Sequence, residues 1–155
     1  MLPTENKIVP LERLAPLPGR KVVLTNGCFD VLHRGHVEYL ERARQLGDLL
    51  VVGVNSDASV RRLKGPTRPV NRDVDRARVL AGLECVSMVV IFEDNRSTGL
   101  MELLKPNIWV KGGDFTIETL PPEEVATARR CGIEIEIMPV VPGYSTTAIL
   151  QRSQR

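Results

Sequence analysis

The chain has 155 residues, 43% of them hydrophobic and 26% charged, which is typical of a globular domain and argues against a disordered chain. Its net charge is +2 and its basic and acidic residues are interspersed, whereas a duplex-binding domain usually carries a Lys/Arg stripe, so a nucleic-acid partner is disfavoured. The three cysteines lack CxxC spacing, so we expect neither disulfides nor a cysteine zinc site. The N-terminus does not resemble a secretory signal, because no apolar stretch follows a basic start, and no run approaches the roughly 18 apolar residues of a membrane span. We therefore expect a cytoplasmic protein without a membrane contact.

The first half of the chain predicts two strands and two helices. An apolar strand at 22–24 precedes a helix from about 35 to 46, whose apolar residues recur at helical spacing. The continuous apolar run 49–54 is typical of a buried parallel strand. After a loop that contains Lys64, Gly65 and Pro66, Asn71 is predicted to cap a helix with apolar residues at 74, 77, 80 and 83.

The second half predicts three more strands and three more helices. Strands are expected at 88–92, at 108–110 and at 133–137, where Ile alternates with Glu as at a sheet edge. Helices are expected from about Ser97 to before Pro106, from Pro121-Pro122 to Gly132, and from around Ser145. This alternation predicts an α/β fold with a parallel, three-layer α/β/α sheet. Residues 1–20 are expected to be a lead-in arm and residues 21–155 a single domain.

Both histidines of the chain follow the first predicted strand. His33 and His36 are three residues apart at a helix start, so their side chains project from the same face. Gly35 lets a ligand approach the backbone, and a helix N-terminus offers unpaired N–H groups and partial positive charge to phosphate. A zinc site lacks a third ligand at recognisable spacing, and Cys28 has no further histidine to activate it as a nucleophile. We therefore predict a phosphate site.

The segment from Thr25 to His36, TNGCFDVLHRGH, resembles the (S/T)-x-G-x-F-D-x-x-H-x-G-H signature of the cytidylyltransferase-like nucleotidyltransferase superfamily. Further stretches, at 54–59, 62–65, 68–71, 75–77, 110–114 and 143–147, are similar to one branch, the D-glycero-β-D-manno-heptose 1-phosphate adenylyltransferases. That branch often forms the C-terminal half of a bifunctional heptose kinase/adenylyltransferase. The resemblance implies a Rossmann-like HxGH fold and an enzyme that joins ATP, with Mg²⁺, to a heptose 1-phosphate and releases pyrophosphate, in lipopolysaccharide biosynthesis.

The resemblance also implies roles for individual residues. Those expected to be catalytic are His33, His36 and Lys64. Those expected to bind the nucleotide are Thr25, Asn26, Gly27, Cys28, Phe29, Lys111, Gly112, Asp114, Tyr144, Ser145, Thr146 and Thr147. Asp30 and Arg76 are expected at the substrate, and no side chain is assigned to a metal.

Plainer roles stay open for several of these residues. Lys64 and Arg76 also suit solvent-exposed positions, and Ser145 suits a helix cap. Asp30 either binds sugar hydroxyls or fixes the turn. Two departures from the family pattern fall on the sugar pocket: Phe115 replaces a common tyrosine, and Leu120-Pro121-Pro122 lacks the usual glycine before the acidic pair Glu123-Glu124.

Two other functions remain as alternatives. One is a glycerol-3-phosphate cytidylyltransferase-like enzyme that uses CTP, and the other is a non-catalytic nucleotide-binding protein. The expected partners are ATP and a sugar 1-phosphate, with a separate heptose kinase upstream, and the resemblance implies a homodimer.

Overall fold

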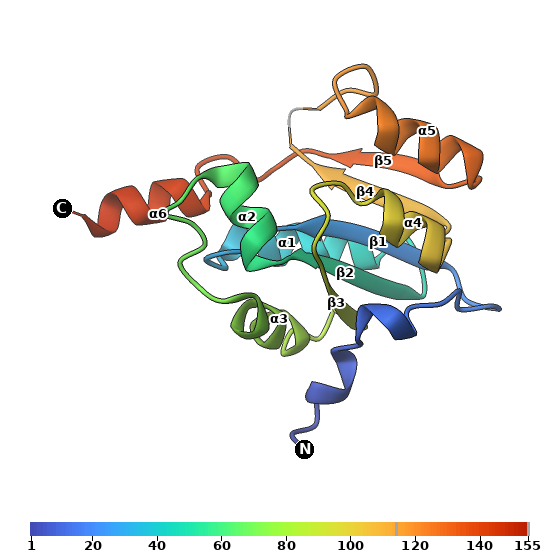
Figure 1. Cartoon of the computed structure of the whole chain (residues 1–155), viewed down its shortest axis with the longest axis horizontal. Coiled ribbons are helices and arrows are strands. Elements are labelled where there is room, and N and C mark those ends of the chain that lie inside the picture. The colour runs from blue at the N-terminus through green and yellow to red at the C-terminus, as the bar shows by residue number, and fades with distance from the viewer. Residues whose placement is uncertain (114, 155) are drawn as a thin grey trace.

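A computed structural model describes residues 1–113 and 115–154, which form a parallel sheet with helices on both faces (Figure 1). The strands are β1 (Val22–Gly27), β2 (Leu49–Asn55), β3 (Met88–Phe92), β4 (Ile108–Gly112) and β5 (Glu134–Met138). The helices are α1 (Arg34–Arg44), α2 (Asp57–Lys64), α3 (Asp73–Ala81), α4 (Thr98–Leu104), α5 (Pro122–Arg130) and α6 (Thr146–Ser153). Two 3₁₀ turns, η1 (Glu5–Lys7) and η2 (Leu11–Arg13), precede the sheet.

The sheet has the strand order β3-β2-β1-β4-β5, and all neighbouring strands are parallel. The chain runs outward from β1 to β3 and then returns to the other side of β1, so strand order reverses between β1 and β4. Right-handed crossovers then place α1 and α3 on one face and α4 and α5 on the other. Leu40 and Leu80 pack with Val23 in one buried cluster, and Leu100 and Val125 pack with Leu24 in the other. This confirms the predicted three-layer fold.

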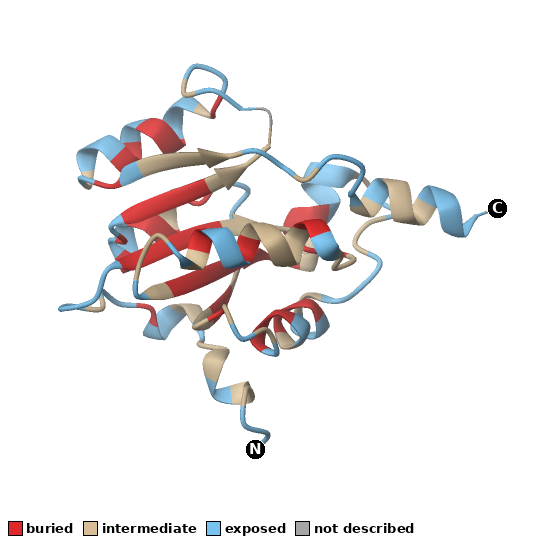
Figure 2. Cartoon of the chain, turned by 180° about the vertical axis from the view of Figure 1, so that it is seen from behind, coloured by how far each residue is buried: buried red, intermediate tan, exposed pale blue. Residues whose placement is uncertain are grey.

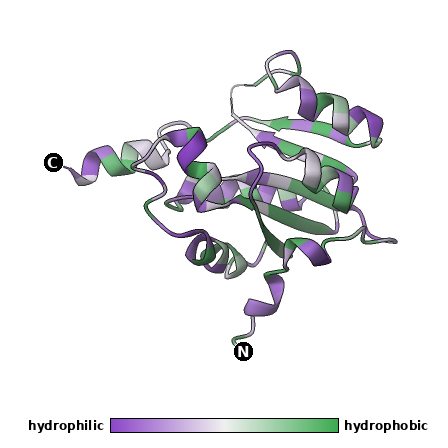
Figure 3. Ribbon diagram, viewed as in Figure 1, coloured by the Kyte–Doolittle hydropathy of each residue, from purple (hydrophilic) through white to green (hydrophobic). Residues whose placement is uncertain are grey.

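The burial of each strand follows its place in the sheet. β2 lies inside the sheet and is buried along nearly its whole length, as its continuous apolar run predicted. β5 is an edge strand with mostly half-buried residues, as the alternation of Ile and Glu predicted. Figure 2 shows the same contrast, and Figure 3 shows the apolar residues concentrated on the inner strands.

Two local predictions were wrong. Residues 57–64 form helix α2, so Lys64 ends a helix and does not lie in a loop. Ser56 caps this helix by accepting a hydrogen bond from Ser59 N (3.2 Å). Asn71 does not cap α3, because Arg72 occupies that position and the Asn71 side chain donates to the backbone carbonyl of Asp30 (2.7 Å). Helix α2 was missed because it is short and mostly polar. The cap at Asn71 was wrong because a tertiary contact with Asp30 engages its side chain.

Residues 8–14 of the N-terminal segment contact the sheet and its core. Ile8 forms a parallel bridge with Val89 of β3, and Val9 N donates to the Val89 carbonyl (2.9 Å). Leu14 is buried in the cluster on the α4 and α5 face. This segment therefore adds to the core beside β3. Of the helices in the described ranges, none has the length and apolar content to cross a bilayer.

Candidate functional site

A cavity of about 560 Å³ lies beyond the carboxyl ends of the central strands. Ligands of open parallel sheets bind at this end, where the strand order reverses, here between β1 and β4. The cavity brings together most of the predicted site residues, from four separate segments. They are Asn26, Gly27, Cys28, Phe29, Asp30, His33, His36, Lys64, Lys111, Gly112, Tyr144, Ser145, Thr146 and Thr147. Asp114 lies outside the described residues.

The two histidines cap helix α1 reciprocally. His36 N donates to His33 Nδ1 (3.4 Å), and His33 N donates to His36 Nδ1 (3.3 Å). The rings are stacked, with centroids 3.8 Å apart and an interplanar angle of 22°. A neutral imidazole whose Nδ1 accepts a hydrogen bond carries its proton on Nε2. Each ring therefore offers one Nε2–H donor to the cavity that both rings line.

The electrostatic environment keeps both rings neutral. Burial, and secondarily the neighbouring His33, lowers the pKa of His36 to about 4. Burial also lowers the pKa of His33 below its usual value. At neutral pH the pair therefore acts as two hydrogen-bond donors rather than as acids or cations.

Close packing around the pair explains two neighbouring residues. A Cβ on Gly35 would lie 2.9 Å from Cε1 of His33 and 3.0 Å from Cβ of Tyr144, so a larger residue would displace the ring. Phe29 has a positive φ of 47°, which is unfavourable for a bulky side chain. Its ring is tilted against His36 with centroids 5.4 Å apart. The turn thus positions the His36 ring through backbone strain and packing.

A second helix N-terminus faces the same cavity. The Ser145 hydroxyl caps α6 by accepting from Ala148 N (3.0 Å), and Thr146 Oγ1 donates to the Val31 carbonyl (3.1 Å), which ties α6 to the loop before α1. The N–H groups of Gly35, Thr146 and Thr147 have no acceptor among residues 1–113 and 115–154, and all three residues line the cavity. Unpaired N–H groups at a helix start are groups that bind anions in proteins.

Two lysines add positive charge to this site. Lys64 stands at the end of α2 and Lys111 at the end of β4, and both line the cavity. Within the described chain neither forms an ion pair. Burial lowers the pKa of Lys111, although the nearby Glu124 acts in the opposite direction. The Lys111 ammonium lies 5.5 Å from the Phe115 ring centroid.

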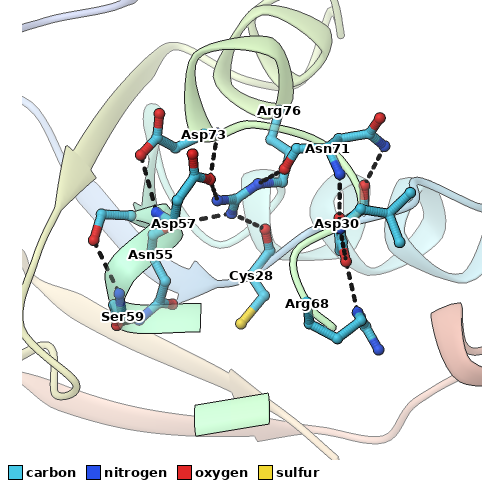
Figure 4. A network of polar contacts seen from close by, with 11 residues as sticks. Cys28, Asp30, Asn55, Asp57, Ser59, Arg68, Asn71, Asp73 and Arg76 are labelled. Carbon is cyan, nitrogen blue, oxygen red and sulfur yellow. Dashed lines mark hydrogen bonds and ion pairs between the residues drawn. The ribbon is translucent and has the colours of Figure 1, made fainter. Parts of the chain in front are cut away.

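Arg76 does not point into this cavity, contrary to the sequence-based expectation. It is 2% exposed, and its guanidinium donates to the carbonyls of Asn71 (2.9 Å), Cys28 (2.6 Å) and Asn55 (2.8 Å) and pairs with Asp57 (2.9 Å). Figure 4 shows how these contacts tie three loops together. Arg76 thus holds these loops in position and does not line the cavity itself.

Asp30 serves the same network. Its carboxylate accepts from Arg68 Nε (2.7 Å) and from the backbone N–H groups of Val70 and Asn71 (2.9 Å each). Hydrogen bonds from Asn71 and Val70 and the Arg68 charge lower its pKa, although burial opposes them. Of the two roles left open for Asp30, the contacts support fixing the turn (Figure 4).

Thr25 is also turned away from the cavity. It is fully buried, its hydroxyl is 2.6 Å from the Tyr39 hydroxyl, and it donates to the Val110 carbonyl (3.0 Å). Cys28 lines the cavity, but burial raises the pKa of its thiol, which does not favour a nucleophilic thiolate. The contacts of Thr25 thus serve the packing of β1, and Cys28 forms part of the cavity wall just after this strand.

Eight cavity residues were given no role at the site by sequence reasoning. They are Tyr39, Asn55, Leu63, Arg68, Asn95, Arg96, Glu124 and Val140. Arg68 lies in a stretch that carried the resemblance, so its position offered a signal. Asn95 and Arg96 lie in the loop after β3, whereas Glu124 lies in the first turn of α5 and contacts Ser97 at the start of α4.

Known proteins are similar to this chain in sequence. The model of the Cytidylyltransferase-like family matches residues 24–152. The chain is 51% identical over 134 residues to the Bifunctional protein HldE of Syntrophotalea carbinolica, covering 86% of this chain and 27% of that protein. It is 47% identical over 155 residues to the Bifunctional protein HldE of Helicobacter pylori strain Shi470, covering 98% of this chain and 32% of that one. The chain thus spans about a third or less of the length of these curated relatives.

Solved structures are similar to this chain in fold. The lipopolysaccharide core biosynthesis protein of Thermoplasma volcanium superposes with a TM-score of 0.64 at 28% identity, covering 79% of this chain and 98% of that one. Pantoate-beta-alanine ligase of Francisella tularensis superposes with a TM-score of 0.53 at 13% identity and shows the fold alone.

Proposed function

Because this chain belongs to the cytidylyltransferase-like family, we propose that it is a nucleotidyltransferase that condenses ATP with D-glycero-β-D-manno-heptose 1-phosphate. The products are ADP-heptose and pyrophosphate. One observation supports this proposal above all: two helix N-termini and two imidazole Nε2–H donors face one cavity at the switch point of the sheet. The branch resemblance of the stretches around Lys64 and Lys111 favours ATP and heptose.

The triphosphate would lie between the two helix starts. The α-phosphate would accept hydrogen bonds from Nε2 of His33 and His36, while the β- and γ-phosphates would meet the N–H groups of Thr146 and Thr147. Lys64 would stabilise the charge between these positions. This arrangement leaves Lys111 and the rest of the cavity to the nucleoside and the acceptor.

The transfer then follows from positioning. An oxygen of the acceptor's phosphate attacks the α-phosphorus, the bond from that phosphorus to the bridging oxygen of the β-phosphate breaks, and pyrophosphate leaves in line. The attacking phosphate is already an anion, so no general base is needed. Neutral imidazoles suit this reaction because they donate hydrogen bonds to the pentacoordinate transition state without a proton transfer.

Mg²⁺ fits this site as a companion of the nucleotide. No group of three His, Cys, Asp or Glu side chains in residues 1–113 and 115–154 is arranged to hold a metal. We therefore propose that triphosphate oxygens and water hold Mg²⁺, as is common at phosphate sites, and that it offsets charge on the phosphates.

A pyrophosphate-release assay tests this function. We expect turnover with ATP and heptose 1-phosphate, little turnover with CTP and glycerol 3-phosphate, and loss of turnover when EDTA removes Mg²⁺. Faster turnover with CTP and glycerol 3-phosphate would favour the cytidylyltransferase alternative. Nucleotide binding without pyrophosphate release from any pair of four NTPs and a panel of sugar 1-phosphates would favour a non-catalytic protein.

A further inference from the structure

Glu124 in the first turn of α5 is a buried carboxylate that the reaction above does not use. It is 2% exposed. Its Oε1 accepts from the backbone N–H (2.9 Å) and the hydroxyl (3.2 Å) of Ser97, at the start of α4. Its Oε2 has no hydrogen-bond partner among the described residues. A buried oxygen of a charged group without a partner is rare in a folded protein and points to a ligand or a bridging water.

A cationic group without an ion pair among the described residues lines the same cavity as this carboxylate. Glu124 and Lys111 both line the main cavity, and their charges interact. They do not form an ion pair with each other in the described structure. The Glu124 wall of the cavity therefore offers a hydrogen-bond acceptor and, from Lys111, a hydrogen-bond donor.

A hydroxyl group matches this pair, because it donates one hydrogen bond and accepts another. A phosphate does not match, since the carboxylate would repel it. The nucleobase also has a better place, against the apolar surfaces of Val140 and Tyr144, which line the same cavity. The polyol part of the acceptor is thus the chemistry that fits the Glu124 wall.

Access to the free oxygen needs a small adjustment. Oε2 has less than 1 Å² of exposed surface in the unliganded chain. The last torsion of a Glu side chain is broad, so the carboxylate can turn toward the cavity at small cost. The contact with Ser97 keeps it in reach of the same wall.

We propose that Glu124 is a specificity-determining residue that, together with Lys111, binds a hydroxyl group of the sugar acceptor. This inference rests on the proposed function, since it names the part of that site that recognises the sugar. Glu124 takes no part in phosphate transfer itself.

The test uses Glu124→Gln, which keeps the size of the side chain and an oxygen for Ser97 but replaces the carboxylate. We expect the KM for heptose 1-phosphate to rise about 10- to 100-fold, the range expected for a hydrogen bond to a charged group, with the KM for ATP within about twofold. The matched control is Glu102→Gln, which removes the same charge from an exposed position on α4, where Glu102 pairs with Arg130. Its KM values should stay unchanged.

A binding measurement separates this inference from the proposed function. Calorimetry would titrate heptose 1-phosphate into wild type and Glu124→Gln in the presence of a non-hydrolysable ATP analogue. Weaker sugar binding by the variant supports the inference even if wild type releases no pyrophosphate, which would refute only the proposed function. Equal sugar affinity and equal KM, or a rise in the KM for ATP alone, refutes the inference while the function stands. Wild type that neither binds nor turns over the sugar refutes both.

Discussion

Two buried polar regions adjoin the end of β1, and they use their hydrogen-bonding groups differently. Arg76 and Glu124 are equally buried, at 2% exposed. The Arg76 guanidinium makes four hydrogen bonds to other parts of the chain, whereas one Glu124 oxygen has no partner in the described structure. Buried polar groups are nearly always paired in folded proteins. The first region is thus complete without a ligand, and the second is not.

Other residues of the two regions also differ in whether their hydrogen-bonding groups have partners within the chain. The Asp30 carboxylate is occupied by Arg68 and two backbone N–H groups, as in Figure 4. By contrast, His33, His36, Thr146 and Thr147 line the cavity, and the N–H groups of the two threonines have no acceptor in the described structure. Substitutions in the Arg76 region should therefore lower stability, while those at the cavity wall should lower activity at nearly constant stability.

The largest expected effect comes from Arg76→Met. The variant removes the cation that pairs with Asp57 and the donor to three carbonyl groups, and removing one partner of a buried ion pair costs about 3–5 kcal/mol of folding free energy. Urea denaturation measures this loss. Arg78→Met on the same helix is the control, because its contact with Glu5 is exposed and 4.0 Å long, and it should cost less than about 1 kcal/mol. Equal stability of the two variants would contradict the structural role of the Arg76 contacts.

The second largest effect is expected for the histidine pair at the cavity. His33→Asn removes the ring and its Nε2–H donor but keeps a good capping residue at the start of α1. We expect kcat for pyrophosphate release to fall about 10²- to 10³-fold, as when one donor to a transition state is lost. The urea midpoint should stay near that of wild type. His36→Ala should lower kcat similarly, and normal turnover by either variant would contradict the assignment of the pair.

The comparison also explains which parts of the protein were predictable from its sequence. The strands and the histidine pair follow from local patterns, because apolar runs and short spacings act within one element. The role of Arg76 does not, since its acceptors come from loops distant in sequence. Glu124 has the same limit: an acidic residue in the first turn of α5 suggests only a favourable helix dipole. Its burial depends on the packing of α5 against α4.

The smallest effect concerns the pH dependence of stability. Burial lowers the pKa of His36 to about 4, whereas in the unfolded chain it should titrate near its usual value of about 6.5. Between these values the unfolded chain binds a proton that the folded chain does not, so the free energy of unfolding should fall as pH drops from about 6.5 to 4 and then level off. The ring is partly exposed, so we expect a loss on the order of 1–2 kcal/mol. His36→Asn lacks this titration, and the difference between its unfolding free energy and that of wild type should vary over this window. A constant difference would mean that the His36 ring is solvated in the folded chain and its Nε2–H is not held for a ligand.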